Sequence, residues 1–274
     1  MSTAVLLRNI SKSYVNPGAY YAERLLSNSS KSMQYKPGFG DQQLIWAIDD
    51  ISFSVQQGEI FGICGPKSSG KSTLIRMLAA LVQPDAGEMR VYGYDVTRHS
   101  RQIQGLSNMV SVEASFYKQL SVMENLLSGA RLYGMKRDDA NRQAEEILIR
   151  LGFSKIERLS AMEALPREKM RMVSIAQALL SRPRLLLMDD KFCGLAVEKK
   201  QEVFVLIDEL RLHYGTTAIL TSSNSDELSG MCDQVITLEK GRMLDLCAQS
   251  ESLKKRQETP EQPIYHQIVF EKVY

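Results

Sequence analysis

The sequence predicts an α/β fold built around a largely parallel sheet, and three observations support this prediction. Short apolar runs of strand length alternate along the chain with segments of helical periodicity, which is typical of parallel strands joined by helices. A glycine-rich segment joins one such strand, IFGIC at 60–64, directly to a helix. A second apolar strand, LLLMD at 185–189, ends in an aspartate where neighbouring strands of such a sheet would also end.

The composition is that of an ordinary globular chain. The 274 residues include 34 basic and 32 acidic side chains, so the net charge is +2, and 44% of the residues are hydrophobic. This balance offers no general surface for phosphate backbones, and we expect no nucleic-acid partner. Four scattered cysteines without a CxxC pair indicate a reducing, cytosolic compartment. We find no signal peptide, and no apolar stretch reaches the roughly 18–20 residues that a membrane span needs.

The N-terminal part predicts antiparallel strands separated by a long insertion. VLLRNISKSY alternates well enough to form an edge strand that ends near Tyr14. Residues 16–45 are rich in Gly, Ser, Pro and Tyr, which predicts an insertion loop. Alternation returns over 47–55, and a tight QQGE turn leads to the strand at 60–64. We therefore expect an antiparallel N-terminal β subdomain that carries the loop.

The remaining elements follow from periodicity and from Gly and Pro positions. The expected helices cover 71–82 (ended by Pro84 and Gly87), 122–150 (interrupted near Gly134), 170–180 and 198–213 (closed by Gly215), and the expected strands cover 185–189, 216–222 and a hairpin over 235–244 turning at Lys240-Gly241. We expect one domain over 1–250, with a helical subdomain at about 113–170, and a charged C-terminal tail over 251–274.

The segment GPKSSGKS at 65–72 fits the phosphate-loop template G-x-x-x-x-G-K-[ST]. Because it follows a strand and opens a helix, its backbone N–H groups and the helix N-terminus can surround an anion. A chance glycine-serine loop is the alternative, and the order of strand, loop, helix and the later LLLMD strand argues against it. Lys71 would reach the β- and γ-phosphates of ATP, while Ser72 and Asp189 would bind Mg²⁺. The predicted nucleotide-binding residues of the loop are Gly65, Pro66, Lys67, Ser68, Ser69, Gly70, Lys71, Ser72 and Thr73.

The order of the motifs resembles the nucleotide-binding subunits of ABC transporters. SKSY, the block at 47–88, SVMENL, SIAQALLSRPRLLLMDD and CDQVITLEKGR follow one another as in that family, over about residues 3–247. The resemblance implies a P-loop NTPase fold and a dimer that binds ATP between one chain's phosphate loop and the other's signature motif. It also implies transmembrane permease subunits and a peripheral position at the cytoplasmic face of the membrane. Tyr14 matches the aromatic residue that stacks on adenine, although ordinary edge packing is the alternative.

Several positions depart from the family's motifs. Asp190 stands where the family has the glutamate that polarises the attacking water, and it is one methylene shorter, which predicts slow hydrolysis. Ser223 takes the place of the histidine at the γ-phosphate, so we predict Asp190 and Ser223 as the catalytic residues. Val112 replaces the magnesium-sensing glutamine, and Glu113 beside it could substitute only after a backbone shift. Ala196 replaces the aspartate that links the two chains.

The signature motif is the most altered. Counted back from Arg171 without gaps, it falls on ALPRE at 164–168, which lacks the serine hydroxyl and both glycines. LSAME at 159–163 looks more similar but would require a five-residue insertion before the next helix, so we favour 164–168. Arg167 could offer positive charge to a γ-phosphate across a dimer, although a solvated arginine at a helix start is the simpler interpretation.

These departures leave two functional hypotheses. The first is an exporter subunit that binds MgATP, hydrolyses it slowly and works beside a different partner chain, with a homodimer as the alternative. The second is a regulatory pseudo-ATPase paired with a complete ABC partner. A soluble P-loop kinase or an ABC protein acting on nucleic acid is disfavoured.

The sequence also offers a weak indication of the cargo. The insertion and the segment 116–135 resemble exporters of polysaccharides such as O-antigen or teichoic acid, although drug- and lipid-exporting subunits have similar segments. The insertion combines aromatic and cationic residues, which suits a membrane interface or a sugar surface as well as an ordinary loop.

Overall fold

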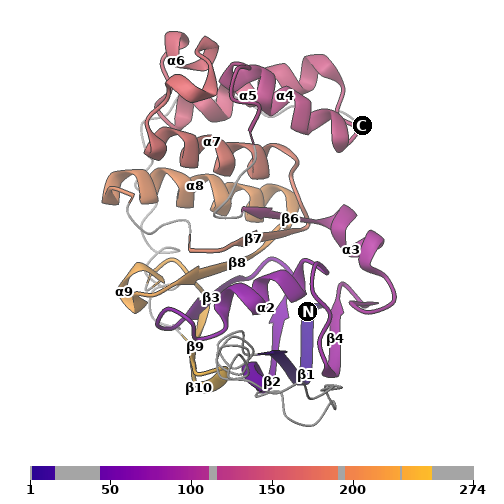
Figure 1. The fold of residues 1–274 in the computed structure, drawn as a ribbon. Helices are drawn as coiled ribbons and strands as arrows, with labels where there is room; N and C mark the ends of the chain where they lie inside the picture. The colour runs from indigo at the N-terminus through magenta and orange to yellow at the C-terminus, as the bar shows by residue number, and fades with distance from the viewer. Residues whose placement is uncertain (1, 16–43, 111–115, 191–194, 229, 249–274) are drawn as a thin grey trace, which may run out of the picture.

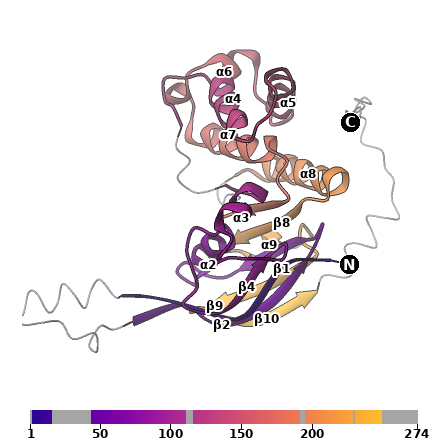
Figure 2. The same cartoon turned by 90° about the vertical axis from the view of Figure 1, so that its right-hand side faces the viewer.

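The computed structural model describes residues 2–15, 44–110, 116–190, 195–228 and 230–248. Within these ranges the elements are stacked in layers: an antiparallel sheet, helix α2, a mostly parallel central sheet, helices α7 and α8, and finally helices α4 to α6 (Figures 1 and 2). Most of the predicted insertion, positions 112 and 113, and the C-terminal tail lie outside the described residues.

The first sheet is antiparallel, as predicted for the N-terminal part. Strand β1 (Thr3–Val15) lies between β2 (Leu44–Gln56) and β4 (Ala86–Val91), and the two-residue strand β5 (Tyr94–Asp95) pairs with β4. The strands β2 and β3, although joined by the predicted tight turn, belong to different sheets. The turn therefore carries the chain from one layer to the next.

The central sheet has the order β10-β9-β3-β8-β7-β6, in which all neighbours are parallel except β10 and β9. Its strands are β3 (Ile60–Cys64), β6 (Ser107–Val110), β7 (Leu185–Met188), β8 (Thr217–Ser222), β9 (Gln234–Glu239) and β10 (Arg242–Ala248). Strands β3, β7 and β8 are buried at every position, which explains their continuous apolar sequences. The two sheets and the helical layers confirm the predicted fold class.

Helix α2 (Lys71–Leu78) lies between the two sheets and joins their cores. Leu74, Ile75 and Leu78 are fully buried there. The predicted extension of this helix to Val82 is wrong. Ala80 adopts a left-handed backbone with φ +53°, which an α-helix cannot contain, and Leu81 is consequently 55% exposed.

The remaining helices follow in chain order, and those from α4 to α8 form the upper layers of Figure 1. They are α3 (Ser100–Leu106), α4 (Val122–Leu132), α5 (Arg137–Arg150), α6 (Lys155–Leu159), a 3₁₀ turn (Met162–Ala164), α7 (Arg167–Leu180), α8 (Val197–Tyr214) and α9 (Ser225–Leu228). Gly134, with φ +72°, separates α4 from α5 as predicted, and Gly215, with φ +67°, ends α8. Ser121 begins α4 through a capping box with Glu124.

None of the helices in the described ranges combines the length and the apolar character that crossing a bilayer would require.

Candidate functional site

The segment 65–70 connects β3 to α2 at the carboxyl ends of the parallel strands, where ligands bind in open α/β sheets. Its two outer glycines are fixed by their neighbours. A Cβ atom on Gly65 would lie 2.2 Å from the carbonyl oxygen of Leu238, and one on Gly70 would lie 2.3 Å from that of Ala47. Both glycines also have positive φ angles, +156° and +106°. The loop is therefore enclosed between β2 and β9.

Lys71 is buried inside this loop, with 7% of its surface exposed. Its Nζ donates hydrogen bonds to the carbonyl oxygens of Gly65 at 2.6 Å and Pro66 at 2.8 Å. Burial lowers the pKa of Lys71, and the carboxylates of Asp190 and Asp189 act in the opposite direction. The two carbonyl oxygens therefore hold the ammonium group inside the loop.

Ser72 and Asp189 meet at the start of α2, although they are 117 positions apart in the sequence. The Ser72 hydroxyl donates to Asp189 Oδ1 at 3.1 Å. Thr221, at the end of β8, donates to the same Oδ1 at 3.2 Å and accepts the backbone N–H of Asp190 at 2.8 Å. Sequence reasoning missed Thr221. The only available signal was its place at the end of a strand that pairs with β7.

Asp190 follows Asp189 with a left-handed backbone, φ +50°. Its Oδ1 is buried and has no hydrogen-bond partner within the described ranges. Burial raises the pKa of Asp190, and the nearby Asp189 and Glu227 carboxylates raise it further, whereas Lys71 and Lys67 lower it. The carboxyl group therefore lies beside the loop, in a position to accept a hydrogen bond from a ligand or from water.

Ser223 is exposed in the short segment between β8 and α9. The preceding Ser222 donates its hydroxyl to Glu227 at 2.6 Å and accepts the Asn224 N–H at 3.0 Å. Glu227 also forms an ion pair with Lys200 in the first turns of α8. Burial acts to raise the pKa of Glu227, but the hydrogen bonds from Lys200 and Ser222 and the charge of Lys200 together lower it. Sequence reasoning missed both partners of this ion pair, which no local motif marks.

Tyr14 lies near the end of β1, paired with Ile45, and is 42% exposed. The Lys12 ammonium lies 5.6 Å from the centre of its ring. On the neighbouring strand, Trp46 is 48% exposed and immediately precedes Ala47, whose carbonyl oxygen faces Gly70. Two exposed aromatic side chains therefore lie on the paired strands β1 and β2, of which β2 contacts the phosphate loop.

The positions counted as the signature motif lie at the start of α7. Pro166 is its N-cap, Leu165 is buried, and Arg167 and Glu168 are exposed in its first turn. The competing segment LSAME is instead attached to the start of α4, through a bridge between Ala161 and Ser121 and a bond from the Met162 N–H to the Leu120 carbonyl oxygen at 3.0 Å. These contacts attach the competing segment to α4, whereas Pro166, Arg167 and Glu168 are exposed at the start of α7. Ala196 is the N-cap of α8.

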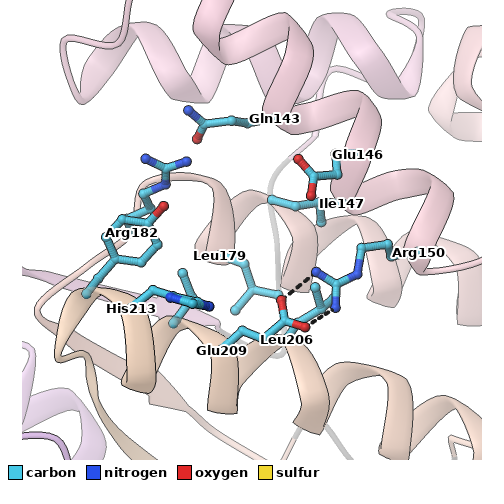
Figure 3. Close-up of a pocket in the computed structure, with 11 residues that line it drawn as sticks. Gln143, Glu146, Ile147, Arg150, Leu179, Arg182, Leu206, Glu209 and His213 are labelled. Atoms are coloured by element: carbon cyan, nitrogen blue, oxygen red, sulfur yellow. Dashed lines mark hydrogen bonds and ion pairs between the residues drawn. The ribbon is translucent and has the colours of Figure 1, made fainter. Parts of the chain in front are cut away.

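A second hollow lies between α5, the end of α7 and α8, and none of the predicted site residues lines it (Figure 3). Leu179 and Leu206 contribute apolar surface to it, and Arg150 of α5 forms a two-pronged ion pair with Glu209 of α8, with both N–O distances at 2.6 Å. This ion pair therefore connects two helical layers, and the hollow lies between them.

The residues around the loop fit a phosphate chain with Mg²⁺. The Ser69 hydroxyl is buried within the loop and has no partner in the described part of the chain, so a phosphate oxygen could accept its hydrogen bond. Lys71 supplies the positive charge. Ser72 and Asp189 offer two oxygen ligands, which suffice because Mg²⁺ takes its remaining ligands from phosphates and water.

A family model described as "ABC transporter" matches residues 48–192, which include the loop and both aspartates. The chain is 30% identical over 207 residues to the linearmycin resistance ATP-binding protein LnrL of Bacillus subtilis, covering 73% of this chain and 66% of that protein. It is 34% identical over 198 residues to the Nod factor export ATP-binding protein I of Mesorhizobium japonicum, covering 71% and 57%. The chain therefore spans less than two thirds of the length of these relatives.

Solved ABC cassettes share the fold. The dimeric bacterial ABC transporter cassette MJ0796 superposes with a TM-score of 0.73 at 18% identity, covering 89% of this chain and 98% of that one. A post-hydrolysis dimer of the same cassette, bound to ADP and phosphate, superposes with a TM-score of 0.71 at 20% identity, with the same coverage. The fold, the motif positions and the family match agree: the chain belongs to the ABC transporter family, as an ATP-binding domain.

Proposed function

We propose that this chain is the ATP-binding subunit of an ABC exporter and that it hydrolyses ATP slowly. The observation that carries the proposal is the contact between Ser72 and Asp189 beside the buried Lys71, because it brings together the cation and the metal ligands that a nucleotide needs. Export is supported by relatives described as resistance or export proteins, although methionine import proteins are also similar to this chain.

In this proposal each residue has a distinct task. The loop N–H groups and Lys71 bind the β- and γ-phosphates, Ser72 and Asp189 hold Mg²⁺, and Tyr14 stacks on the adenine. Bound Mg²⁺ would neutralise charge on the phosphates. Asp190 accepts a hydrogen bond from the attacking water, and Ser223 donates one to the γ-phosphate. Hydrolysis is slow because Asp190 is shorter than glutamate and Ser223 carries no charge.

The proposed partner is a different, catalytically complete ABC chain. Composite sites of this family use the phosphate loop of one chain and the signature motif of the other. This chain carries defects in both parts, at Asp190 and Ser223 and at 164–168. Paired with a complete chain, each of the two sites would be impaired once, whereas a homodimer would have two sites that are each impaired twice.

A groove on α4 and the start of α5 suits the transmembrane permease subunits. It is lined by Glu124, Leu127, Ser128, Arg131, Met135, Arg137 and Ala140. Apolar side chains between charges of both signs match a short amphipathic helix of a partner. Docking there would hold the chain peripherally at the cytoplasmic face of the membrane. A polysaccharide cargo stays a prediction from sequence resemblance, since the relatives named above are described by linearmycin resistance and by Nod factor export.

The test is a titration of the purified chain with MgATP, followed by the fluorescence of Trp46, the only tryptophan in the sequence. We expect saturable binding that Lys71→Ala weakens by at least about tenfold. No binding by the unmodified chain would contradict the proposal. Brisk turnover by the chain alone would leave ATP binding standing and refute the slow hydrolysis.

The variant Asp190→Asn distinguishes a slow ATPase from the alternative hypothesis, a regulatory subunit that binds ATP without hydrolysing it. Steady-state phosphate release should be slow for the unmodified chain and should fall to background in the variant, with MgATP binding retained. If release is equal in both proteins, the regulatory pseudo-ATPase is the better account, because binding alone can close a dimer.

A further inference from the structure

The end of β1 that carries Tyr14 extends beyond the neighbouring strand β4. Ser11 pairs with Ala86, the first residue of β4, whereas β1 continues to Val15 with β2 beside it. The two strands run on together past the rest of their sheet (Figure 2). In the described part of the chain, β4 therefore provides no strand partner for the last residues of β1.

The Asp85 carboxylate, immediately before β4, holds this end of β1 in place of a strand. The Asp85 N–H donates to the Ser11 carbonyl oxygen at 2.9 Å. Ser13 donates both its backbone N–H, at 2.8 Å, and its hydroxyl, at 2.9 Å, to Asp85 Oδ2. The Lys12 ammonium donates to the other oxygen, Oδ1, at 2.5 Å. One side chain therefore holds the two residues that directly precede Tyr14.

Both of these residues connect Asp85 to the candidate nucleotide site. Lys12 and Tyr14 are two positions apart in a strand and so share a face, and the Lys12 ammonium lies 5.6 Å from the centre of the Tyr14 ring. Opposite the step from Lys12 to Ser13, the register of β1 and β2 shifts at Ala47. The Ala47 carbonyl oxygen faces Gly70 of the phosphate loop. The contacts of Asp85 thus fix the end of β1 beside the point where β2 meets the loop.

The Asp85 carboxylate is held in its charged form. Burial acts to raise the pKa of Asp85, but the hydrogen bonds from Lys12 and Ser13 and the charge of Lys12 together lower it. The Asp85 side chain is 38% exposed, so water screens part of its attraction to Lys12. Because exposed ion pairs contribute little to stability, a substitution at Asp85 should leave the fold intact and change mainly the position of the strand end.

We propose that Asp85 is a positioning residue for the adenine base of the bound nucleotide. It holds the Tyr14 ring at a fixed place beside the phosphate loop, through the two residues that precede the ring. The inference rests on the proposed function, in which Tyr14 stacks on adenine, and adds to it a residue that itself does not touch the nucleotide. Stacked rings need a defined offset and separation. Without Asp85, ordering the strand end on binding would cost part of the affinity for the base.

The experiment compares, by calorimetry, the dissociation constants of MgATP and of magnesium tripolyphosphate, which lacks the base and the sugar. The ratio of the two constants isolates the contribution of the nucleoside. We expect Asp85→Ala to weaken MgATP binding about fivefold, because a stacking contact contributes up to about tenfold in affinity. Tripolyphosphate binding should stay unchanged. Asp85→Asn keeps an acceptor oxygen for Ser13 and loses the charge, so it should show a smaller loss in the same direction.

A second comparison shows whether the effect of Asp85 acts through Tyr14. Tyr14→Leu removes the aromatic ring, and in this background we expect Asp85→Ala to weaken MgATP binding no further. The matched control is Glu88→Ala, because Glu88 is a β4 carboxylate that pairs with Arg8 of β1 at 3.4 Å, farther along the strand from the Tyr14 end. This control should bind both ligands as the unmodified chain does.

The outcomes separate the two proposals. If the unmodified chain does not bind MgATP, the proposed function fails. If it does, and Asp85→Ala leaves the affinity unchanged or weakens both ligands equally, the inference about Asp85 is overturned while nucleotide binding stands. An undiminished effect of Asp85→Ala in the Tyr14→Leu background would also overturn it, as would an equal loss of MgATP affinity in Glu88→Ala. Should Asp85→Ala fail to fold, Asp85→Asn carries the same comparisons.

Discussion

Thr221 bonds to both acidic residues of the candidate site and has no charge of its own. Its hydroxyl donates to Asp189 Oδ1 and accepts the Asp190 N–H, so it fixes one carboxylate and the backbone of the next residue. Groups that orient a metal ligand from behind can matter almost as much as the ligand. Thr221 is therefore a positioning residue for the proposed Mg²⁺ site.

Replacing Thr221 with valine keeps the shape and removes the hydroxyl. We expect the Mg²⁺ concentration that half-saturates nucleotide binding to rise about tenfold, because Asp189 loses a bond that aims its carboxylate. The matched control is Thr216→Val, which removes the hydroxyl that donates to the Pro183 carbonyl oxygen at 2.8 Å. That variant should lose stability with the Mg²⁺ dependence unchanged. Equal Mg²⁺ dependence in both variants would contradict the role given to Thr221.

At the scale of elements, an ion pair connects two helices that follow the ends of neighbouring strands. Lys200 lies in the first turns of α8 and Glu227 lies in α9, and both side chains are 17% exposed. Glu227 also receives the hydroxyl of Ser222, and the Ser222 carbonyl oxygen accepts the Gly65 N–H at 3.2 Å. This chain of contacts runs from α8 to the first residue of the phosphate loop.

Stability should depend on pH through Glu227. The pKa of Glu227 in the folded chain lies below its ordinary value, so the folded state favours the charged form. Its contribution to stability is complete above the unfolded pKa of about 4.3 and is lost as the pH falls through the lower folded pKa. We expect Glu227→Gln to lower the free energy of unfolding by about 1–3 kcal/mol at pH 7 and by less near pH 3.

Urea unfolding at the two pH values measures this difference. Glu239→Gln, at an exposed strand end, is the control and should change stability little at either pH. A penalty for Glu227→Gln that is as large at pH 3 as at pH 7 would mean that packing, rather than charge, carries the effect.

The elements that the sequence predicted best are those determined by local pattern. The buried runs of β3, β7 and β8 and the break at Gly134 all correspond to residues that can be read within one window of sequence. The end of α2 could not be predicted in this way, because the left-handed turn at Ala80 interrupts an apolar periodicity that continues beyond it. Strands β4 and β6 were also missed, since both are short and partly exposed.

The residues of the candidate site likewise fall into those that local sequence reveals and those that only the folded chain brings together. The phosphate loop and Asp189 are recognisable from spacing and chemistry alone. Thr221, Lys200 and Glu227 are not, because their roles arise from strands and helices that meet only in the folded chain. An ordinary threonine and an ordinary ion pair carry no local signal, so their positions depend on the order of strands in the central sheet.

At the scale of the whole molecule, the ion pair between Arg150 and Glu209 joins the helical layer of α4 to α6 to the layer above the central sheet (Figure 3). About a third of each side chain is exposed, so the pair is partly screened by water. Even so, its two parallel hydrogen bonds define a relative orientation of α5 and α8. It can therefore hold the two layers at one angle.

A double-mutant cycle of Arg150→Met and Glu209→Gln measures the coupling energy of this ion pair. We expect a coupling energy of about 0.5–1 kcal/mol from urea unfolding. Each single variant should also increase amide hydrogen exchange in α5 more than in α2, which lies between the sheets. Additive effects in the cycle would show that the two layers are held by apolar packing alone.

The glycines at both ends of the phosphate loop press against the backbones of β2 and β9. A loop confined in this way cannot widen to admit a bulkier anion unless both sheets move. Any change in the ligand that the loop binds must then be made through its three exposed side chains, at positions 66 to 68, with the loop backbone unchanged.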